Sequence, residues 1–542
     1  MSGFRFAFSL QKSEVEKAHP PGTAKLYDHQ LQRSALGTHT DQDDILVLIP
    51  KPSADPADPL NWATWRKVMV LLSLCYYTFV GNVVATTLTS ALGYLEIAFP
   101  TIPYAKLIRA LAVNTLMMGC SNIFWVPLGN IFGRRTVTIL GLLILGLTSI
   151  WCAKANDYGS LVGARIFQGI GIGPSETVSP TVIGEIFFLH QRGRAMAVYT
   201  VFLVLGSIIG AIIGSYIAAE AGWRWTQWLN VIMSLAGLAF TFFFQPETLY
   251  LPRVNGANDE DLPDPTSLDP VDSTEEKPTT HRGEDIVETA SYAPFTFKRS
   301  LKVGMYRGNI IHEFIGPWRT LMFPSVWIIM LQYGGLVGGV AAAESMAVIF
   351  VSEPPYLWGA KAGLISIGGL IGSVLGVIAT FFTSDFVVKR QAHRQTNGLS
   401  EPETRLPAMI PGLILATAGI WAFGFSAATG SPHAWIGLEF GIGMICFGLM
   451  QVPSIGFNYL IESYHSISGD CFVIITSLRA IISFAWSFFV GNWVTADGFN
   501  EPFGIFGMLM GIFGLLTIPL FVYGKRIRIA TAHLVPTSGK VE

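Results

Sequence analysis

Long apolar stretches, separated by shorter polar ones, dominate the chain from residue 67 onwards. Each is about 20 residues long, the length that an α-helix needs to cross the hydrocarbon core of a bilayer. They fall into two groups of six. The predicted spans are 67–91, 107–130, 136–153, 158–184, 195–219 and 225–245, then 323–350, 361–384, 408–428, 433–460, 470–495 and 502–524. The pattern therefore predicts an all-α membrane protein with twelve transmembrane helices in two six-helix bundles.

Polar segments divide this pattern into five parts. We predict a flexible N-terminal tail at 1–65, bundles at 66–245 and 321–526, a largely disordered central loop at 246–320, and a C-terminal tail at 527–542. In the loop, residues 259–288 hold eleven Asp and Glu against two basic residues, a composition that cannot bury a core. The basic stretch that follows, from Lys298 to Arg307, is either an amphipathic helix on the inner leaflet or a solvated linker.

Composition and charge support the membrane interpretation. The chain is 51% hydrophobic and 13% charged, whereas soluble domains carry about 25% charged residues. Neither the five cysteines nor the ten histidines have metal-ligand spacing, so no metal site is expected. Thirteen Lys and Arg flank the spans on one side and five on the other, which places both termini and the central loop in the cytoplasm. Nothing in the sequence indicates nucleic-acid binding, so no nucleic-acid partner is expected.

Polar residues on the fourth span are the strongest candidates for chemistry. Residues 163–187 carry Arg165, Gln168, Glu176 and Glu185 within a mostly apolar run. A charge at the centre of a membrane helix costs about 2.5–3.5 kcal/mol on insertion scales, so such residues usually face the bundle interior or a wet cavity. Two prolines in the same stretch fit a broken helix that lines a cavity.

Arg165 and Glu176 are eleven positions apart, which places them about 20° apart around a regular helix and roughly 16 Å along it. Glu176 then lies near the middle of the span. A buried carboxyl group has a raised proton affinity, so Glu176 is expected to bind a cationic substrate, to carry a proton, or to do both in turn. The alternative is a structural carboxylate that is hydrogen-bonded between helices.

Two further spans carry candidate cavity residues. Glu344 and Tyr333 lie eleven positions apart on the seventh span and share a face. Arg479 on the eleventh span shares a face with Trp486 and Trp493. These residues are expected to line a cavity, although Arg479 has the alternative of extending to the inner surface.

Two sequence patterns recur in both halves. Asn130, Gly133, Arg134 and Arg135 follow the second span, and Asp385 and Lys389 follow the eighth. Runs of glycine at every fourth position also occur on the fifth and eighth spans, and such runs let helix backbones approach closely. They are expected to form a sliding contact between the bundles, with packing inside one bundle as the alternative. The runs are Gly206, Gly210 and Gly214, and Gly368, Gly372 and Gly376.

These motifs resemble those of the major facilitator superfamily. Arg165-x-x-Gln168-Gly169 resembles its fourth-span motif, and Gly133-Arg134-Arg135 resembles the end of its loop 2–3 signature. DPLNW at 58–62, and Glu176 with the acidic-Phe-Phe end at 185–188, look like the fungal drug:proton antiporter branch, which includes polyamine and multidrug carriers. The resemblance implies the major facilitator fold, a role for Arg165 in proton coupling or local structure, and a clasp of Glu185 with Arg134 or Arg135 at the inner gate.

The chain departs from the family pattern at two places. The usual Asp of the loop 2–3 signature is Asn130, which leaves the predicted clasp with one charge fewer. The Gly-Pro of the fifth-span antiporter signature is Gly210-Ala211, which removes the kink that this signature implies. Antiport is therefore less strongly supported by the sequence than the fold.

A carrier is the function class that these observations favour. There is no catalytic cluster in the spans, and no G-x-x-x-x-G-K-[ST] loop for ATP, so an enzyme and an ATP-driven pump are both excluded. The leading expectation is proton-driven efflux of small organic molecules, with the proton gradient in place of a cofactor. Uptake of a small organic cation such as a polyamine, and a non-transporting sensor, are the alternatives. A monomer in the plasma membrane is expected, with the vacuolar membrane as the alternative.

Overall fold

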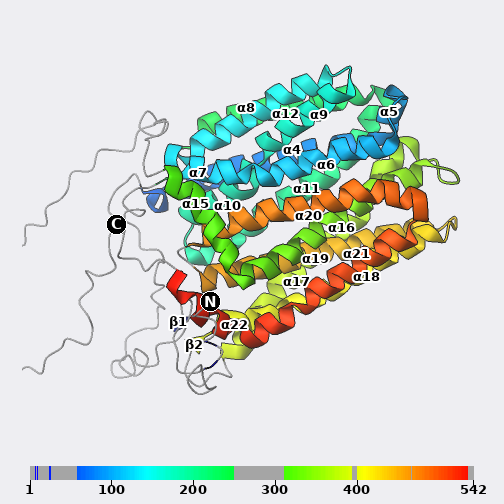
Figure 1. Ribbon diagram of the computed structural model, residues 1–542. Coiled ribbons are helices and arrows are strands. Elements are labelled where there is room, and N and C mark those ends of the chain that lie inside the picture. Colours follow the sequence, from blue (N-terminus) through cyan, green and yellow to red (C-terminus); the bar gives the residue numbers. More distant parts are fainter. Residues whose placement is uncertain are drawn as a thin grey trace, which may run out of the picture.

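The computed structural model describes residues 58–249, 310–392, 399–464 and 467–534, together with Ala7, Ser9 and the strand β1 (Ala24–Lys25). The N-terminal and C-terminal halves of the chain form two groups of long helices that lie side by side and run along one common direction (Figure 1). β1 pairs antiparallel with β2 (Leu399–Ser400), so part of the N-terminal tail meets the loop before the ninth predicted span.

The N-terminal bundle begins after the short 3₁₀ helix η1 (Pro59–Asn61). Its helices are α4 (Thr64–Ser90), α5 (Leu92–Ala98), α6 (Tyr104–Cys120), α7 (Asn122–Phe132), α8 (Arg134–Ala153), α9 (Tyr158–Ile172), α10 (Pro174–Ile186), α11 (Leu189–Glu220) and α12 (Trp223–Phe244).

The C-terminal bundle follows helix α15 (Ile310–Arg319) and the 3₁₀ turn η3 (Thr320–Met322). Its elements are α16 (Pro324–Ser352), η4 (Gly359–Ser366), α17 (Ile367–Ala392), η5 (Pro402–Met409), α18 (Ile410–Ala428), α19 (Ala434–Ser463), α20 (Ser468–Asp497), α21 (Asn500–Leu515), α22 (Thr517–Thr531) and η7 (Ala532–Leu534). Residues 250–309, which hold the predicted acidic segment and the basic stretch, lie outside the described residues.

Eleven helical segments in the described part of the chain are long and apolar enough to cross a membrane. They correspond to eleven of the twelve predicted spans. The remaining one, the predicted fourth span 158–184, is formed by two consecutive helices, α9 and α10, of 15 and 13 residues. The second and twelfth predicted spans are also divided, between α6 and α7 and between α21 and α22. Between α9 and α10 the break comes at Pro174, which lacks the backbone N–H that would continue the helix.

Side chains from neighbouring helices repair the broken backbone between α9 and α10. Pro174 leaves the carbonyl of Ile170 without its usual donor, and the indole Nε1 of Trp125 donates to it at 2.8 Å. The hydroxyl of Tyr77 donates to the next carbonyl, that of Gly171, at 2.5 Å. An unpaired peptide group in an apolar interior costs several kcal/mol, so these two donors make the break tolerable at membrane depth.

The fifth and eighth predicted spans meet between the bundles as expected, but the glycine runs do not make that contact. Gly206, Gly210 and Gly214 on α11 pack against α4, where added Cβ atoms would lie 2.3–2.5 Å from atoms of that helix. The run on α17 packs in the same way against α19, within the C-terminal bundle. Glycine spacing marks close approach between backbones but does not say which helix is the partner.

Other small residues contribute to the contacts between the bundles. Gly119 on α6 faces Ala480 on α20, and Gly491 on α20 faces Ile108 on α6. The fifth and eighth predicted spans do meet, but through η4: an added Cβ on Gly363 would lie 2.4 Å from the carbonyl oxygen of Ala211. The α6–α20 and α11–η4 contacts are therefore central parts of the seam between the halves.

Candidate functional site

An ion pair between Glu176 and Arg479 joins the two bundles inside the molecule. Glu176 lies in the first turn of α10, just after the helix break, and Arg479 lies midway along α20. The Glu176 carboxylate accepts a hydrogen bond from Nη2 of Arg479. The two side chains are 9% and 4% exposed. Sequence analysis identified both residues as candidates but did not predict that they pair.

Arg479 is enclosed by aromatic rings as well as by its carboxylate partner. Its guanidinium lies 4.7 Å from the ring centroid of Tyr333 on α16. Tyr333 in turn packs edge-on against Phe457, with the centroids 5.6 Å apart. The alternative in which Arg479 extends to the inner surface is therefore wrong, since its charge is held inside by Glu176 and the Tyr333 ring.

Arg165 and Gln168 lie in a separate polar network within the N-terminal bundle. Arg165 is fully buried and donates to the carbonyls of Val84 and Ala85 on α4, at 3.0 and 3.1 Å, and to Oε1 of Gln168. Gln168 donates to Ser149 Oγ and to Gln227 Oε1, both at 3.0 Å. No carboxylate pairs with Arg165 among the described residues. These contacts tie α9 to α4, α8 and α12.

A second charged cluster lies at the predicted cytoplasmic end. Arg134 at the start of α8 forms an ion pair with Glu185 at 3.1 Å, the pairing that the resemblance implied. Its Nη1 also donates to Oδ1 of Asn130 at 2.7 Å, and Thr248 donates to the other oxygen of Glu185 at 2.8 Å. The neutral Asn130 therefore takes part in the cluster. Arg135 instead donates to the carbonyl of Phe242.

Glu247 completes this cluster and was missed by sequence analysis. Its two carboxylate oxygens accept from the backbone N–H groups of Arg134 and Arg135, at 2.9 and 3.2 Å, and so cap the N-terminus of α8. The carboxylate fits because Gly133 has φ +95°, a left-handed conformation, and a Cβ there would lie 2.3 Å from Glu247 Oε2. The cap fixes α8 to the segment after α12.

Glu247 gives a prediction about pH. Burial raises the pKa of Glu247 above its ordinary value of 4.5, and the N–H groups that it caps offset part of that rise. Because the unfolded chain then loses this proton first, the contribution of Glu247 to stability falls as the pH rises from about 4.5 through the folded-state pKa. Thermal unfolding should be measured for purified wild type and for Glu247→Gln. The Tm of the wild type minus that of the variant should decline as the pH rises over this range. A constant or increasing wild-type advantage contradicts the argument.

The C-terminal half has a similar cluster of ion pairs at the corresponding helix ends. Arg405 in η5 pairs with Glu462 at the end of α19, at 2.5 Å, as Arg134 pairs with Glu185. Glu403, 6% exposed, binds the fully buried Arg528 of α22 through two contacts of 2.7 Å. The available signal was the tripeptide Pro-Glu-Thr, which occurs at 246–248 and again at 402–404. Asp385 and Lys389 belong to α17, but their side chains lie outside the described residues.

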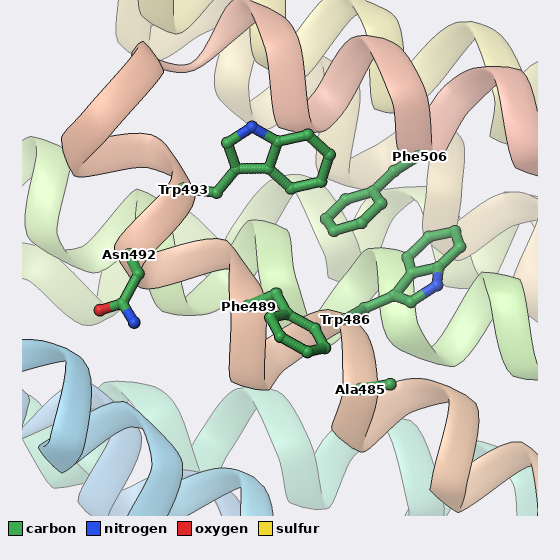
Figure 2. A pocket seen from close by; sticks show the side chains of 6 residues that line it. All are labelled: Ala485, Trp486, Phe489, Asn492, Trp493 and Phe506. Atoms are coloured by element: carbon green, nitrogen blue, oxygen red, sulfur yellow. The ribbon is translucent and has the colours of Figure 1, made fainter.

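The tryptophans that share a face with Arg479 line a different feature. A pocket of about 380 Å³ lies between α20 and α21, and Figure 2 shows aromatic rings from both helices around it. Trp486 stacks on Phe506, with centroids 4.3 Å apart. Phe489 at the pocket is 60% exposed. Arg479 is not among the lining residues, so the expected stripe divides between an internal ion pair and an aromatic pocket. The lining residues are Ala485, Trp486, Phe489, Asn492, Trp493 and Phe506.

Glu344 stands apart from the ion pair. It lies on α16, is half-buried, and has no hydrogen bond or ion pair with any other residue that the structure describes. Tyr333, predicted on the same face, instead contacts Arg479 and Phe457. The structure therefore leaves Glu344 as an unpaired carboxyl group within a membrane helix.

Comparison with known proteins gives a consistent answer. The family model described as Major Facilitator Superfamily matches residues 68–485. Protein HOL1 of Saccharomyces cerevisiae is 26% identical, with 93% of each chain covered. Multidrug transporter TPO1_2 of Candida glabrata is 26% identical over 88% of this chain and 77% of its own length. The solved structure of the proton:xylose symporter XylE has a TM-score of 0.57 at 15% identity, covering 88% of this chain and 97% of that one.

Proposed function

Because the chain belongs to the Major Facilitator Superfamily, we propose that it is a proton-coupled transporter that exports small organic molecules by alternating access. In this proposal twelve spans cross the plasma membrane, counting α9 with α10 as one crossing, and both termini are cytoplasmic. The proton gradient supplies the energy and the monomer is the working unit. The observation that carries the proposal is the Glu176–Arg479 ion pair, which links the bundles that have to move.

This ion pair can respond to protons. Removing one partner of a buried pair leaves an uncompensated charge, which costs about 3–5 kcal/mol. Protonation neutralises Glu176, whereas the guanidinium of Arg479 keeps its charge at any physiological pH. The attraction between α10 and α20 is therefore strong when Glu176 is ionised and weak when it is protonated. A proton bound from one side would thus loosen the contact between the bundles and permit their rearrangement.

Three observations bear on what is carried and in which direction. A relative named as a multidrug transporter favours export of chemically varied organic molecules. The unpaired carboxyl of Glu344 favours the second candidate, uptake of a small organic cation such as a polyamine, because a cation would supply the partner that Glu344 lacks. The altered fifth-span motif, with Ala211 in place of proline, leaves this second candidate in play.

Flux in proteoliposomes tests the proposal. With protein reconstituted in a known orientation, an imposed inward proton gradient should drive movement of a labelled substrate in the opposite direction, and collapse of the gradient with an ionophore should abolish accumulation. A screen of neutral, anionic and cationic candidates identifies the substrate class. Accumulation of a cation together with protons would favour uptake. Binding without accumulation or counterflow would identify a sensor and overturn the transport proposal.

A further inference from the structure

Helix α15 lies across the ends of helices from both bundles. It leads through η3 into α16, so it is joined to the C-terminal bundle. It packs against α7 of the N-terminal bundle and against the first turns of α20 (Figure 1). α15 thus covers the seam between the bundles at the end that we assign to the cytoplasm, and the transport proposal has not used it.

Three contacts fix α15 in this place. The side-chain Nδ2 of Asn130 donates to Glu313 Oε2 at 2.7 Å. The ring of Phe314 lies 6.1 Å from that of Phe124 on α7. On the other side Gly316 lies so close to α20 that an added Cβ would be 2.9 Å from Oδ2 of Asp470. The first two contacts cross between the bundles, and the third holds α15 to its own.

We propose that α15 is a latch that holds the cytoplasmic ends of the two bundles together, and that the amide of Asn130 makes the latch possible. An amide both donates and accepts. Asn130 donates to Glu313 and accepts from Arg134 at 2.7 Å, so one neutral side chain ties the latch to the Arg134–Glu185 pair. An ionised aspartate at this position would still accept from Arg134, but it would face Glu313 with a like charge and no proton to donate.

The latch accounts for the neutral Asn130 at the position where the loop 2–3 signature usually has an aspartate. Opening the cytoplasmic end requires α7 and α15 to separate, because they belong to opposite bundles. Separation breaks a hydrogen bond to a carboxylate, the stronger class of hydrogen bond in proteins. The latch therefore biases the protein toward the state in which this end is closed, whatever the substrate is.

The test moves the negative charge of the Asn130–Glu313 pair from one residue to the other. Asn130→Asp should repel Glu313, whereas Asn130→Asp combined with Glu313→Gln restores a donor opposite an acceptor, now with the charge on α7. Spin labels at Phe243→Cys and Ile410→Cys report the separation of the bundles by pulsed electron resonance, since these side chains are 61% and 42% exposed at that end. A Cys120→Ser background removes the one native thiol that is not buried.

The single variant Asn130→Asp should raise the ratio of the open to the closed inner end by about tenfold, the size expected for loss of a charged hydrogen bond. The double variant should return the distances to those of the wild type, with both proteins unfolding within a few degrees of it. Unchanged distances in the single variant, or equal opening in the single and double variants, would overturn the latch. Because the readout is a distance, this result is independent of whether the protein exports anything.

Discussion

Glu176→Gln should lower gradient-driven transport at least tenfold, equivalent to about 1.4 kcal/mol or more in the barrier. Glutamine is a permanent mimic of the protonated carboxyl, so it retains one hydrogen bond to Arg479 but cannot exchange a proton. Substrate counterflow without a gradient should survive better than accumulation, because exchange needs movement of the bundles but no net proton transfer. The measurement is the ratio of the two fluxes in the same proteoliposomes.

Glu220→Gln is the matched control for this prediction, since Glu220 is an exposed carboxylate at the end of α11. It should leave both fluxes unchanged. Where Glu176→Gln lowers the amount of folded protein, the double variant with Arg479→Gln removes the uncompensated charge and should recover abundance without recovering accumulation. Wild-type accumulation in Glu176→Gln, or in the double variant Glu176→Gln with Arg479→Gln, would show that Glu176 takes no part in the coupling mechanism.

Arg528→Ala should produce the largest loss of stability, about 3–5 kcal/mol in the free energy of unfolding, because it leaves the buried Glu403 carboxylate without its partner. Arg528 is fully buried, and both of its contacts with Glu403 are 2.7 Å. The double variant Glu403→Gln with Arg528→Met should recover most of that loss, since no unpaired buried charge remains. Thermal unfolding followed with a thiol-reactive dye suits this protein, because four of its five cysteines are buried.

A neighbouring ion pair supplies the control for Arg528. Lys525 lies on the same helix as Arg528, and its Nζ is 2.6 Å from Oε1 of Glu401. These two side chains are 15% and 28% exposed. Lys525→Ala should therefore cost only about 0–1 kcal/mol, as partly solvated pairs usually do. Equal losses in the two alanine variants would mean that burial does not distinguish the pairs.

The sequence predicted most of the fold because membrane spans follow from local composition. A run of about 20 apolar residues has few other stable arrangements, and eleven of the twelve predicted spans coincide with helical segments that are long and apolar enough to cross a membrane. The fourth is interrupted at Pro174, and the sequence does not show which side chains replace the backbone hydrogen bond that is lost there. Trp125 and Tyr77 repair the break from sequence distances of 45 and 94 residues, and nothing in local composition predicts such contacts.

The candidate site was predicted as residues but not as an arrangement. The free energy needed to place a charge inside the bilayer identifies Glu176 and Arg479 as candidates one at a time. They are 303 positions apart in the sequence, and only the packing of α10 against α20 brings them together. The prediction for the glycine runs was wrong for the same reason. Their spacing identifies a helix surface that packs closely, but it does not identify the helix that packs against it. Glu247 and Glu403 lie at span ends, where charged residues are common and therefore uninformative. Only the repeated Pro-Glu-Thr tripeptide marks them.

The break before α10 has an electrostatic consequence. A helix that begins at Pro174 places the positive end of a macrodipole within the predicted fourth span. Glu176 lies in that first turn. A carboxylate there gains about 0.3–1 kcal/mol from the helix terminus itself, and more where water is excluded. The proline thus sets a local field for an anion in a place where an unbroken helix would supply none, and Arg479 adds to it from the opposite bundle.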